Sequence, residues 1–444
     1  MPSLRQGAEA SASLGHRAQW LQVSLDPAVM WPGVTREAFA TAMRDIADVT
    51  RQVLQGPTPA PTLTTGQATD ARTLGIAAFV SGMGPLLGYW AERGVVRAAS
   101  EADAVLRAHR AHAVRRHAML ADRLAEALAA MRSLDVAPTV LKGMHTAWQY
   151  LPDPGTRTIG DIDLLIRPSE LARASEALRR TGLVEGRRTP RPFRSEWTPP
   201  GPQPIHSLEL DHADNPWSVD LHIALERRYA RGVSASFGPA AFGGPQPITI
   251  NGHRAQGLAQ PLLAAFLALH ASYGLDSLQL ARLVELTLVI RHDVLSRRLR
   301  WADLRALVTG TGTAGFVYPA FRLVEDLAPG TVSTPFLATV EAAASPRAQR
   351  VVRAILDGGW YRLTRRSLDD KLMWASGPRQ VLFNLTELVW PSEGSPADVL
   401  RQHGRRLAAL AGRWFRLHAG PSHGSRRSAA SHPSKERHAS DQTQ

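Results

Sequence analysis

The sequence predicts an α+β fold, in which a small mixed sheet is flanked by helices and followed by an all-α C-terminal region. Two observations indicate this class. Apolar residues recur at helical spacing before residue 135 and after residue 257, and short runs with strand character occur only between those positions. The third observation is size, because 444 residues, of which 44% are hydrophobic and 20% charged, suffice for two or three domains with their own cores.

We expect four segments along the chain. They are an N-terminal leader with helices (1–97), a core that contains the sheet (98–257), a helical domain (258–418) and a disordered basic tail (419–444). The tail is rich in Ser, His, Arg and Gly and has almost no large apolar residue, so it cannot offset the entropy lost on ordering.

Helices precede the sheet. A loose leader over 1–30 is followed by a predicted helix over 35–54 and by a Pro/Thr-rich linker over 56–66. A largely buried helix is predicted over 70–93 and a long one over 100–134, which Asp135 and the nearby Pro138 end. The long helix carries His109, His112 and His117 among arginines. We interpret this as a solvated basic face, with a metal or RNA contact as the alternative.

The middle of the chain mixes strands with short helices over 144–150 and 168–181. The Pro/Arg-rich segment 186–204 is predicted to be a mobile, solvated loop, with contact to single-stranded nucleic acid as the alternative. We expect 207–212 and 218–223 to pair with each other through a turn at Asn215 and Pro216. The predicted strands are 139–141, 159–166, 183–184, 207–212, 218–223 and 247–251.

Everything after residue 258 has helical spacing. Helices are predicted over 258–273, 276–296, 301–309 and 314–327, with several more up to 418. Residues 310–315 fit the pattern GxGxxG, but a dinucleotide site would need a buried strand before it. A turn between two helices is therefore the prediction.

Charge and composition narrow the classes of function. The net charge is +13, but residues 401–444 hold nine Lys or Arg against two Asp or Glu, so the body of the protein is only mildly basic. Cys is absent, which excludes disulfides and cysteine nucleophiles. No apolar run reaches the roughly 20 residues of a membrane helix. We therefore expect a cytoplasmic protein without a membrane partner.

Asp161 and Asp163 carry the strongest chemical signal. Residues two apart on a strand point to the same side, so both carboxylates would project from one face while Ile162 and Leu164 enter a core. A second strand sets Asp220 between apolar neighbours and would add a third carboxylate. Carboxylates on buried strands need a partner, and hard oxygen ligands suit Mg²⁺. Solvated acids at a strand end are the alternative for the Asp-x-Asp pattern alone.

Cations lie close to these acids in the sequence. A strand runs into a Gly turn and a helix at Lys142, Gly143 and Met144, where exposed N–H groups would favour phosphate. Lys142 is one of three lysines among 52 basic residues, which suggests a task that needs a compact ammonium rather than a guanidinium. Arg157 lies four residues before Asp161 and adds a second cation.

These motifs together resemble a known family. The run LKGMHTAWQYLPDPGTRTIGDIDLLIRPSELARASEALRRTGL, followed by VDLH, is similar to the uncharacterised bacterial nucleotidyltransferase family of the polymerase-β superfamily. The shared pattern is an LKG turn, an Arg before a DIDLL strand, a helix that ends near a Gly, and a later VDLH strand. The similarity covers about residues 118–330 and includes LALHASYGL and Glu285 in LARLVELTLVI.

The resemblance implies a nucleotidyltransferase sheet and a set of roles. Two Mg²⁺ ions would be bound by Asp161, Asp163 and Asp220, and Asp220 would also help to deprotonate the attacking hydroxyl. The implied reaction is Mg-dependent transfer of a nucleoside monophosphate from an NTP to an unknown acceptor hydroxyl, with release of pyrophosphate.

The resemblance also implies a nucleotide-binding set: Gly143 would approach the phosphates, and Lys142 and Arg157 would neutralise the triphosphate. In one departure from the superfamily, Met144 rather than Ser follows Gly143. This departure motivates the alternative of a nucleotide- or partner-binding module without catalysis. The basic tail and loop 186–204 make nucleic acid a possible partner, which is not the favoured one.

Overall fold

The computed structural model describes residues 27–389, apart from 57–58, 64–68, 187–192, 231–232, 274, 276–278, 359, 361–371 and 376. Most of the predicted leader, the helices predicted between 390 and 418, and the tail 419–444 lie outside the described residues. The described residues up to Glu387 belong to one compact unit. The division into four segments stays a prediction.

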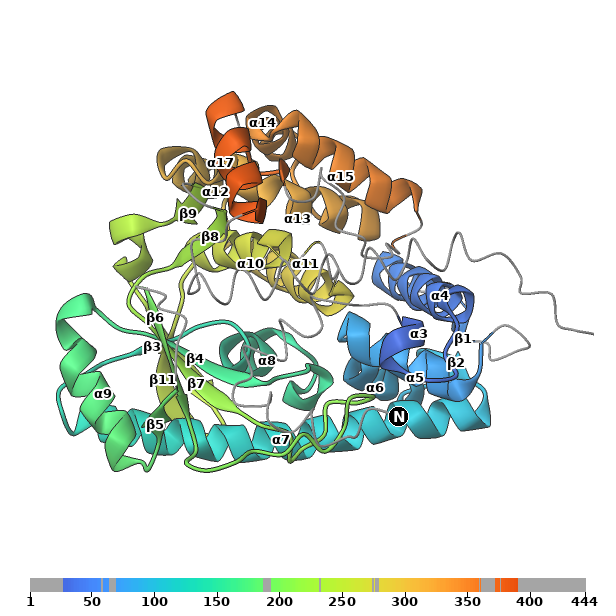
Figure 1. The fold of residues 1–444 in the computed structure, drawn as a ribbon, viewed down its shortest axis with the longest axis horizontal. Helices are drawn as coiled ribbons and strands as arrows, with labels where there is room; N and C mark the ends of the chain where they lie inside the picture. Colours follow the sequence, from blue (N-terminus) through green and yellow to red (C-terminus); the bar gives the residue numbers. More distant parts are fainter. Residues whose placement is uncertain are drawn as a thin grey trace, which may run out of the picture. The chain divides into compact units, whose positions relative to one another are not determined.

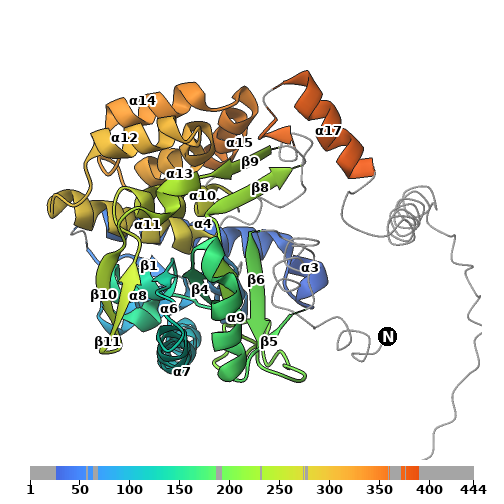
Figure 2. The same ribbon diagram turned by 90° about the vertical axis from the view of Figure 1, so that its left-hand side faces the viewer.

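A seven-stranded mixed sheet confirms the expected α+β class (Figures 1 and 2). Its strand order is β10-β11-β3-β4-β7-β6-β5. Two neighbouring pairs, β4 with β7 and β11 with β3, are parallel, and the other pairs are antiparallel. The strands are β3 (Thr139–Val140), β4 (Asp161–Leu165), β5 (Val184–Glu185), β6 (Arg194–Thr198), β7 (Ser218–His222), β10 (Gln246–Ile250) and β11 (His253–Gly257).

Helices surround this sheet, and after β11 the described residues form helices without further strands, as predicted for the C-terminal region. Two small sheets pair β1 (Thr62–Leu63) with β2 (Arg97–Ala98), and β8 (Glu226–Ala230) with β9 (Val233–Ser236). The helices are α3 (Pro27–Met30), α4 (Arg36–Gln55), α5 (Ala71–Ser81), α6 (Gly84–Glu92), α7 (Ser100–Arg132), α8 (Met144–Tyr150), α9 (Leu171–Arg180), α10 (Leu262–Tyr273), α11 (Leu280–Leu295), α12 (Trp301–Gly310), α13 (Ala314–Leu327), α14 (Thr334–Ala343), α15 (Pro346–Asp357) and α17 (Pro378–Val389).

One face of the sheet packs on α7 and α9. Ile162 and Leu164 of β4 and Val219 and Leu221 of β7 are fully buried in this core. The facing residues come from the second half of α7, which includes Leu124, and from α9. Burying each large aliphatic side chain stabilises the fold by roughly 1.5–3 kcal/mol. The first half of α7 packs on α5 and α6 instead, so this helix joins the N-terminal helices to the sheet (Figure 1).

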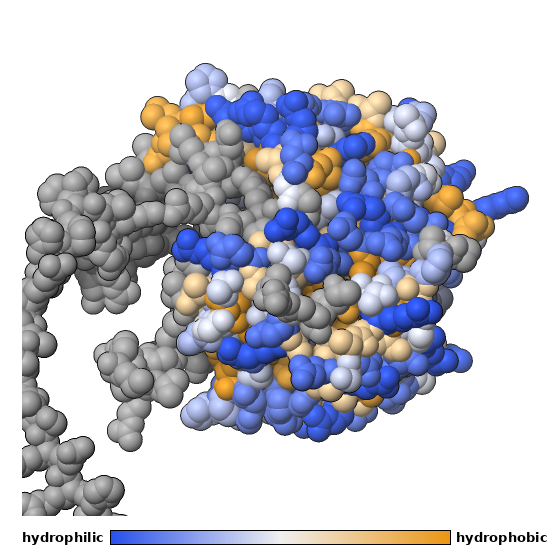
Figure 3. Space-filling model, turned by 90° about the vertical axis from the view of Figure 1, so that its right-hand side faces the viewer, coloured by the Kyte–Doolittle hydropathy of each residue, from blue (hydrophilic) through white to orange (hydrophobic). Residues whose placement is uncertain are grey.

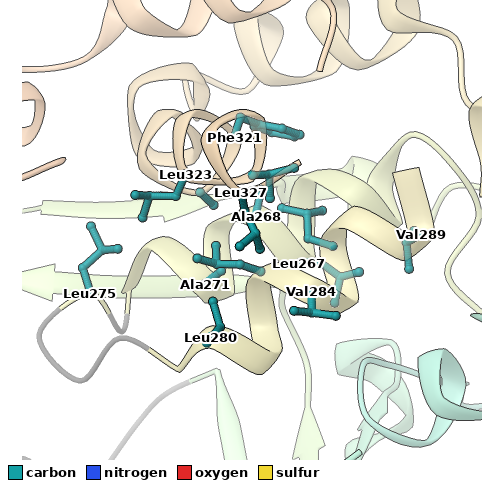
Figure 4. Close-up of a cluster of buried hydrophobic side chains, with 14 of the residues drawn as sticks. Leu267, Ala268, Ala271, Leu275, Leu280, Val284, Val289, Phe321, Leu323 and Leu327 are labelled. Carbon is teal, nitrogen blue, oxygen red and sulfur yellow. The ribbon is translucent and has the colours of Figure 1, made fainter. Parts of the chain in front are cut away.

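The opposite face of the sheet is turned toward the C-terminal helices. Leu165, two residues beyond Asp163 on β4, belongs to a second core that includes α10, α11 and α13. Figure 4 shows part of this core, in which side chains of the three helices meet between their axes. The acids of β4 and β7 alternate with the residues of the first core. They therefore point to the side where these helices lie.

The prediction of one helix over 70–93 is wrong, because the chain breaks between α5 and α6. Gly82 ends α5 in the left-handed conformation with φ 74°, and its N–H donates to the Phe79 carbonyl. Pro85 then lies in the first turn of α6. A left-handed Gly followed by a Pro is the usual combination of helix end and helix start.

The prediction of a strand over 207–212 is also wrong. The side-chain oxygen of Asn215 accepts hydrogen bonds from the backbone N–H groups of His206 (2.8 Å) and Ser207 (3.2 Å). The backbone of this segment is therefore satisfied by side chains rather than by a strand ladder. The predicted partner strand, β7, pairs with β4 and β6 instead.

The Pro/Arg-rich segment 186–204 is not a continuous loop. Residues 187–192 lie outside the described part, but Arg194 to Thr198 form β6 between β5 and β7. Trp197 of this segment is fully buried, and its indole N–H donates to Ser195 Oγ at 3.1 Å. The alternation of Arg194, Ser195, Glu196, Trp197 and Thr198 is that of a strand with one buried face.

The predicted solvated basic face on α7 is wrong for most of its residues. His109, Arg110, Arg116 and His117 are buried. Arg116 is fully buried and donates to the carbonyls of Asn215 (2.7 Å) and Pro216 (2.7 Å), and also to that of Ile159 just before β4. This single guanidinium thus ties the start of β4 to the segment that leads into β7.

Among the described residues, no single helix is long and apolar enough to cross a membrane. The helices α5 and α6 meet the length and composition criteria only when taken together, and they are bent by 118°. On the face drawn in Figure 3, hydrophilic side chains cover much of the coloured surface, with apolar ones in small groups between them.

The GxGxxG segment forms the predicted turn between two helices. It lies between the end of α12 at Gly310 and the start of α13 at Ala314.

Candidate active site

Parallel pairing of β4 and β7 brings the predicted acids together. The register aligns Asp163 with Asp220 and Asp161 with Ser218. Asp163 is 1% exposed and Asp220 is 3% exposed, so both carboxyl groups are removed from solvent. His222 lies two residues beyond Asp220 on the same face and is also buried. The parallel pairing of β4 and β7 thus places Asp163 and Asp220 beside each other.

Asp163 is the most heavily bonded of the acids. Its Oδ2 accepts a hydrogen bond from Lys142 Nζ, and its Oδ1 lies 3.0 Å from His222 Nε2. Burial by itself would raise the pKa of the Asp163 carboxyl. The Lys142 charge and the His222 hydrogen bond outweigh burial and hold that pKa well below its usual range. Asp163 is therefore a carboxylate at neutral pH.

Asp220 has a different environment, although it is equally buried. Its Oδ2 forms an ion pair of 2.6 Å with Arg194 of β6, whereas its Oδ1 is buried and has no hydrogen-bond partner among the described residues. Burial raises the pKa of the Asp220 carboxyl, Arg194 opposes this, and the charges of Asp161 and Asp163 raise it further. The unpaired oxygen marks a place where a proton or a cation would be stabilised.

Asp161 stands at the open edge of the cluster. Its side chain is 37% exposed, and its Oδ2 lies 4.0 Å from Lys142 Nζ. Lys142 itself is buried and thus contacts Asp163 while lying near Asp161. The compact ammonium serves two neighbouring carboxylates, which agrees with the unusual choice of Lys in this Arg-rich chain.

Gly143 and Arg157 are neighbours at the turn before α8. Gly143 has φ 72°, a conformation that side chains rarely adopt, and a Cβ built there would lie 3.4 Å from an Arg157 nitrogen. Arg157 is held by Glu285 of α11 through two hydrogen bonds of 2.9 and 3.0 Å. Glu285 is buried and also accepts a hydrogen bond from Thr146. The turn is thus fixed to the C-terminal helices by an internal ion pair.

Three of these residues could hold a cation. Asp163, Asp220 and His222 each offer a ligand atom, and the three atoms lie within 4.8 Å of one another. The unpaired Oδ1 of Asp220 and the ionised Asp163 fit a divalent cation, and the two carboxylates are the ligand type that Mg²⁺ prefers. Asp161 does not belong to this group of three.

Some site residues were not recognised as such from the sequence. Arg194 was assigned to a loop, although its alternation with Ser195 and Glu196 was visible. Glu285 has no role assigned from the sequence. Glu285 is a lone acid in an apolar helical run, and such a residue must find a partner when it is buried.

Comparison with known proteins identifies one family. Residues 67–329, more than half of the chain, match a family model described as an uncharacterised nucleotidyltransferase. No curated protein and no solved structure matches the chain.

Proposed function

The chain belongs to the uncharacterised nucleotidyltransferase family, and we propose that it transfers a nucleoside monophosphate from an NTP to an acceptor hydroxyl and releases pyrophosphate. The observation that carries this proposal is the alignment of Asp163 with Asp220 on parallel strands, with one buried carboxylate oxygen unpaired. We further propose that the enzyme is of the polymerase-β superfamily type and acts in the cytoplasm.

In the proposed reaction, the acceptor oxygen attacks the α-phosphorus, the bond from this phosphorus to the bridging oxygen breaks, and pyrophosphate leaves. Asp220 accepts the proton of the attacking hydroxyl. Asp161, Asp163 and Asp220 would hold Mg²⁺, which would supply charge stabilisation on the phosphoryl oxygens when bound. The ion pair between Arg157 and Glu285 keeps the Gly143 turn in place, so that backbone rather than side chain faces the phosphates.

Titration calorimetry of each NTP tests the proposal. With Mg²⁺ present, the wild-type protein should bind at least one NTP, and Asp163→Asn should weaken this binding by about tenfold or more while the variant stays folded. Asp214→Asn, at an exposed position of the same charge type, is the matched control and should bind like wild type. Wild-type affinity in Asp163→Asn, or affinity that does not depend on Mg²⁺, would reject the metal assignment.

A second function is favoured by the ion pairs that Asp163 and Asp220 form within the protein. Asp163 is neutralised by Lys142 and Asp220 by Arg194. Together with Met144 after Gly143, this supports a nucleotide- or partner-binding module that does not catalyse transfer. Tight NTP binding without pyrophosphate release, whatever acceptor is offered, would identify this alternative. Pyrophosphate release with any hydroxyl acceptor would exclude it.

A further inference from the structure

The cations expected to neutralise a triphosphate are already engaged. Lys142 donates a hydrogen bond to Asp163, and Arg157 donates two hydrogen bonds to Glu285. Arg194 is likewise paired with Asp220. Three positive charges near the site are thus offset by three carboxylates. Beyond any Mg²⁺ held by the acids, a polyphosphate bound here would need other cations, because a buried phosphate with too little counter-charge is strongly disfavoured.

Two further arginines lie on the side of the site where the C-terminal helices begin. Arg227 is on β8, a few residues after β7, and its NH2 group lies 2.6 Å from His270 Nδ1 on α10. Arg282 is in the first turn of α11, and its NH1 group lies 3.5 Å from the His270 carbonyl oxygen. Both side chains are half-buried. We name Arg227, His270 and Arg282 the helix-side cluster.

The helix-side cluster differs from the other cations in having no acid. Within the part of the chain that the structure describes, neither Arg227 nor Arg282 forms an ion pair with a carboxylate. The buried Nε of Arg227 has no hydrogen-bond partner there. Arg116 is buried as well, but carbonyl oxygens surround its guanidinium. The Arg227 guanidinium lies over the Tyr273 ring, 5.7 Å from its centroid, but no described carboxylate balances the charge of Arg227 or of Arg282.

The electrostatics of the helix-side cluster agree with this geometry. Burial, together with the charges of Arg227 and Arg157, lowers the pKa of Arg282 to about 10. Burial also lowers the pKa of Arg227, with a contribution from Arg194. Opposing contributions from Asp161 on Arg282 and from Asp163 on Arg227 show that the cluster and the acids lie within one electrostatic neighbourhood. Mutually repelling, desolvated cations are costly unless an anion joins them.

His270 extends the donor set of the cluster. Because Arg227 donates to Nδ1, the imidazole is neutral and carries its proton on Nε2. Burial and the nearby arginines hold the pKa of His270 well below its usual range, which keeps it neutral. The cluster thus combines two guanidinium groups with one neutral N–H donor, a set that suits phosphate oxygens.

We infer that Arg227, His270 and Arg282 form a subsite for a phosphate group of a substrate, on the helical side of the carboxylates. The inference rests on the proposed function in assigning this phosphate to a substrate of transfer. The phosphate comes either from the polyphosphate tail of the NTP or from a phosphorylated acceptor, and both use the same chemistry.

Tripolyphosphate binding without Mg²⁺ tests the subsite directly. Calorimetric titration in the presence of EDTA should show binding to wild type, and Arg227→Gln and Arg282→Gln should each weaken it by about tenfold or more. Arg228→Gln is the matched control, because Arg228 is the next residue on β8 and is exposed. Its affinity should stay within about twofold of wild type. Absence of binding by wild type, or an equal loss in all three variants, would overturn the inference.

Stability gives a second readout, which does not depend on binding. Removing a desolvated cation that lacks an acidic partner should leave the ligand-free protein as stable as wild type or more stable. Arg282→Gln should therefore have an unchanged or raised midpoint of urea unfolding, and added tripolyphosphate should raise the midpoint less in the variant than in wild type. A strongly lowered midpoint for Arg282→Gln would show that the cluster is structural and would overturn the inference.

Competition assigns the source of the phosphate. If the subsite takes the NTP tail, a non-hydrolysable NTP analogue and tripolyphosphate will exclude each other. If it takes an acceptor phosphate, both will bind together; either result supports the subsite.

Failure of the inference is distinguishable from failure of the proposed function. Loss of Mg-dependent NTP binding in Asp163→Asn with no effect of Arg282→Gln on tripolyphosphate rejects only the subsite. The reverse pattern rejects only the metal-dependent reaction.

Discussion

Asp163 and Asp220 are direct Cα partners across the parallel strands β4 and β7, and a different cation neutralises each of them. Lys142, from the turn after β3, forms an ion pair with Asp163. Arg194, from β6, forms an ion pair with Asp220. Both pairs are largely shielded from water, so neither acid can lose its partner without a cost in stability. The same ion pairs position the carboxylates and hold them apart from solvent, which links the fold to the proposed chemistry.

Arg194→Gln should destabilise the protein when Asp220 is charged. The variant leaves a buried carboxylate beside Asp163, and at pH 9 the free energy of unfolding should fall by about 3 kcal/mol. Urea unfolding measures this change, and adding Asp220→Asn should restore most of it, because a neutral amide needs no counter-charge. Arg173→Gln, at an exposed position on α9, is the control. Failure of the double variant to recover would mean that Arg194 acts through packing instead.

Glu285→Gln should release Arg157 from its ion pair. Glu285 is 4% exposed and holds Arg157 through two hydrogen bonds, so we expect a loss of about 3 kcal/mol in the free energy of unfolding. The pair between Arg72 and Glu209 has similar contacts, but both side chains are more than 40% exposed. Glu209→Gln should therefore cost less than about 1 kcal/mol in the same urea titration. Equal losses of unfolding free energy in Glu285→Gln and Glu209→Gln would contradict the expectation that burial makes the first ion pair the more important one for stability.

Arg116→Lys should damage the fold even though the charge is kept. A single ammonium cannot reach the carbonyls of Ile159, Asn215 and Pro216 together, as the guanidinium does. Leaving buried carbonyls unpaired should lower the free energy of unfolding by about 3 kcal/mol. The neighbouring, exposed Arg115→Lys is the control. Thermal unfolding followed by circular dichroism measures both, and matching midpoints would refute the expectation.

His109 and His117 should make stability fall as the pH decreases below neutral. Burial lowers the pKa of each imidazole to about 4, against 6.5 ordinarily. Between these values the unfolded chain binds a proton that the folded state does not, so the stabilising contribution is complete above pH 6.5 and is lost toward pH 4. The slope is roughly 1.4 kcal/mol per pH unit for each histidine. Urea unfolding at pH 7.5 and pH 5.5 measures it.

His109→Gln should reduce the slope of the free energy of unfolding against pH by the contribution of one histidine. This holds whatever the substitution does to stability at neutral pH. The exposed His253→Gln serves as the matched variant and should keep the full wild-type dependence. An unchanged slope in His109→Gln would show that this imidazole titrates in the folded state as freely as in the unfolded one.

The sequence by itself determined the fold class, the strand that carries Asp161 and Asp163, and the strand that carries Asp220. These features depend on local periodicity: acids and aliphatic residues alternate along β4 and β7, so one face must be polar and the other buried. The long helix α7 and the helices of the C-terminal region were visible for the same reason, since their apolar residues recur at helical spacing.

Only the tertiary structure decided which partner each polar group receives. Arg194 lies on a strand because β6 fits between β5 and β7. The buried side chains of His109, Arg116 and His117 on α7 face carbonyls supplied by residues distant in the sequence. Lys142 and Arg157 lie against Asp163 and Glu285, while Arg227 and Arg282 have no such acid among the described residues. Periodicity specifies which face is buried, whereas ion pairs depend on distances between separate elements, which packing alone fixes.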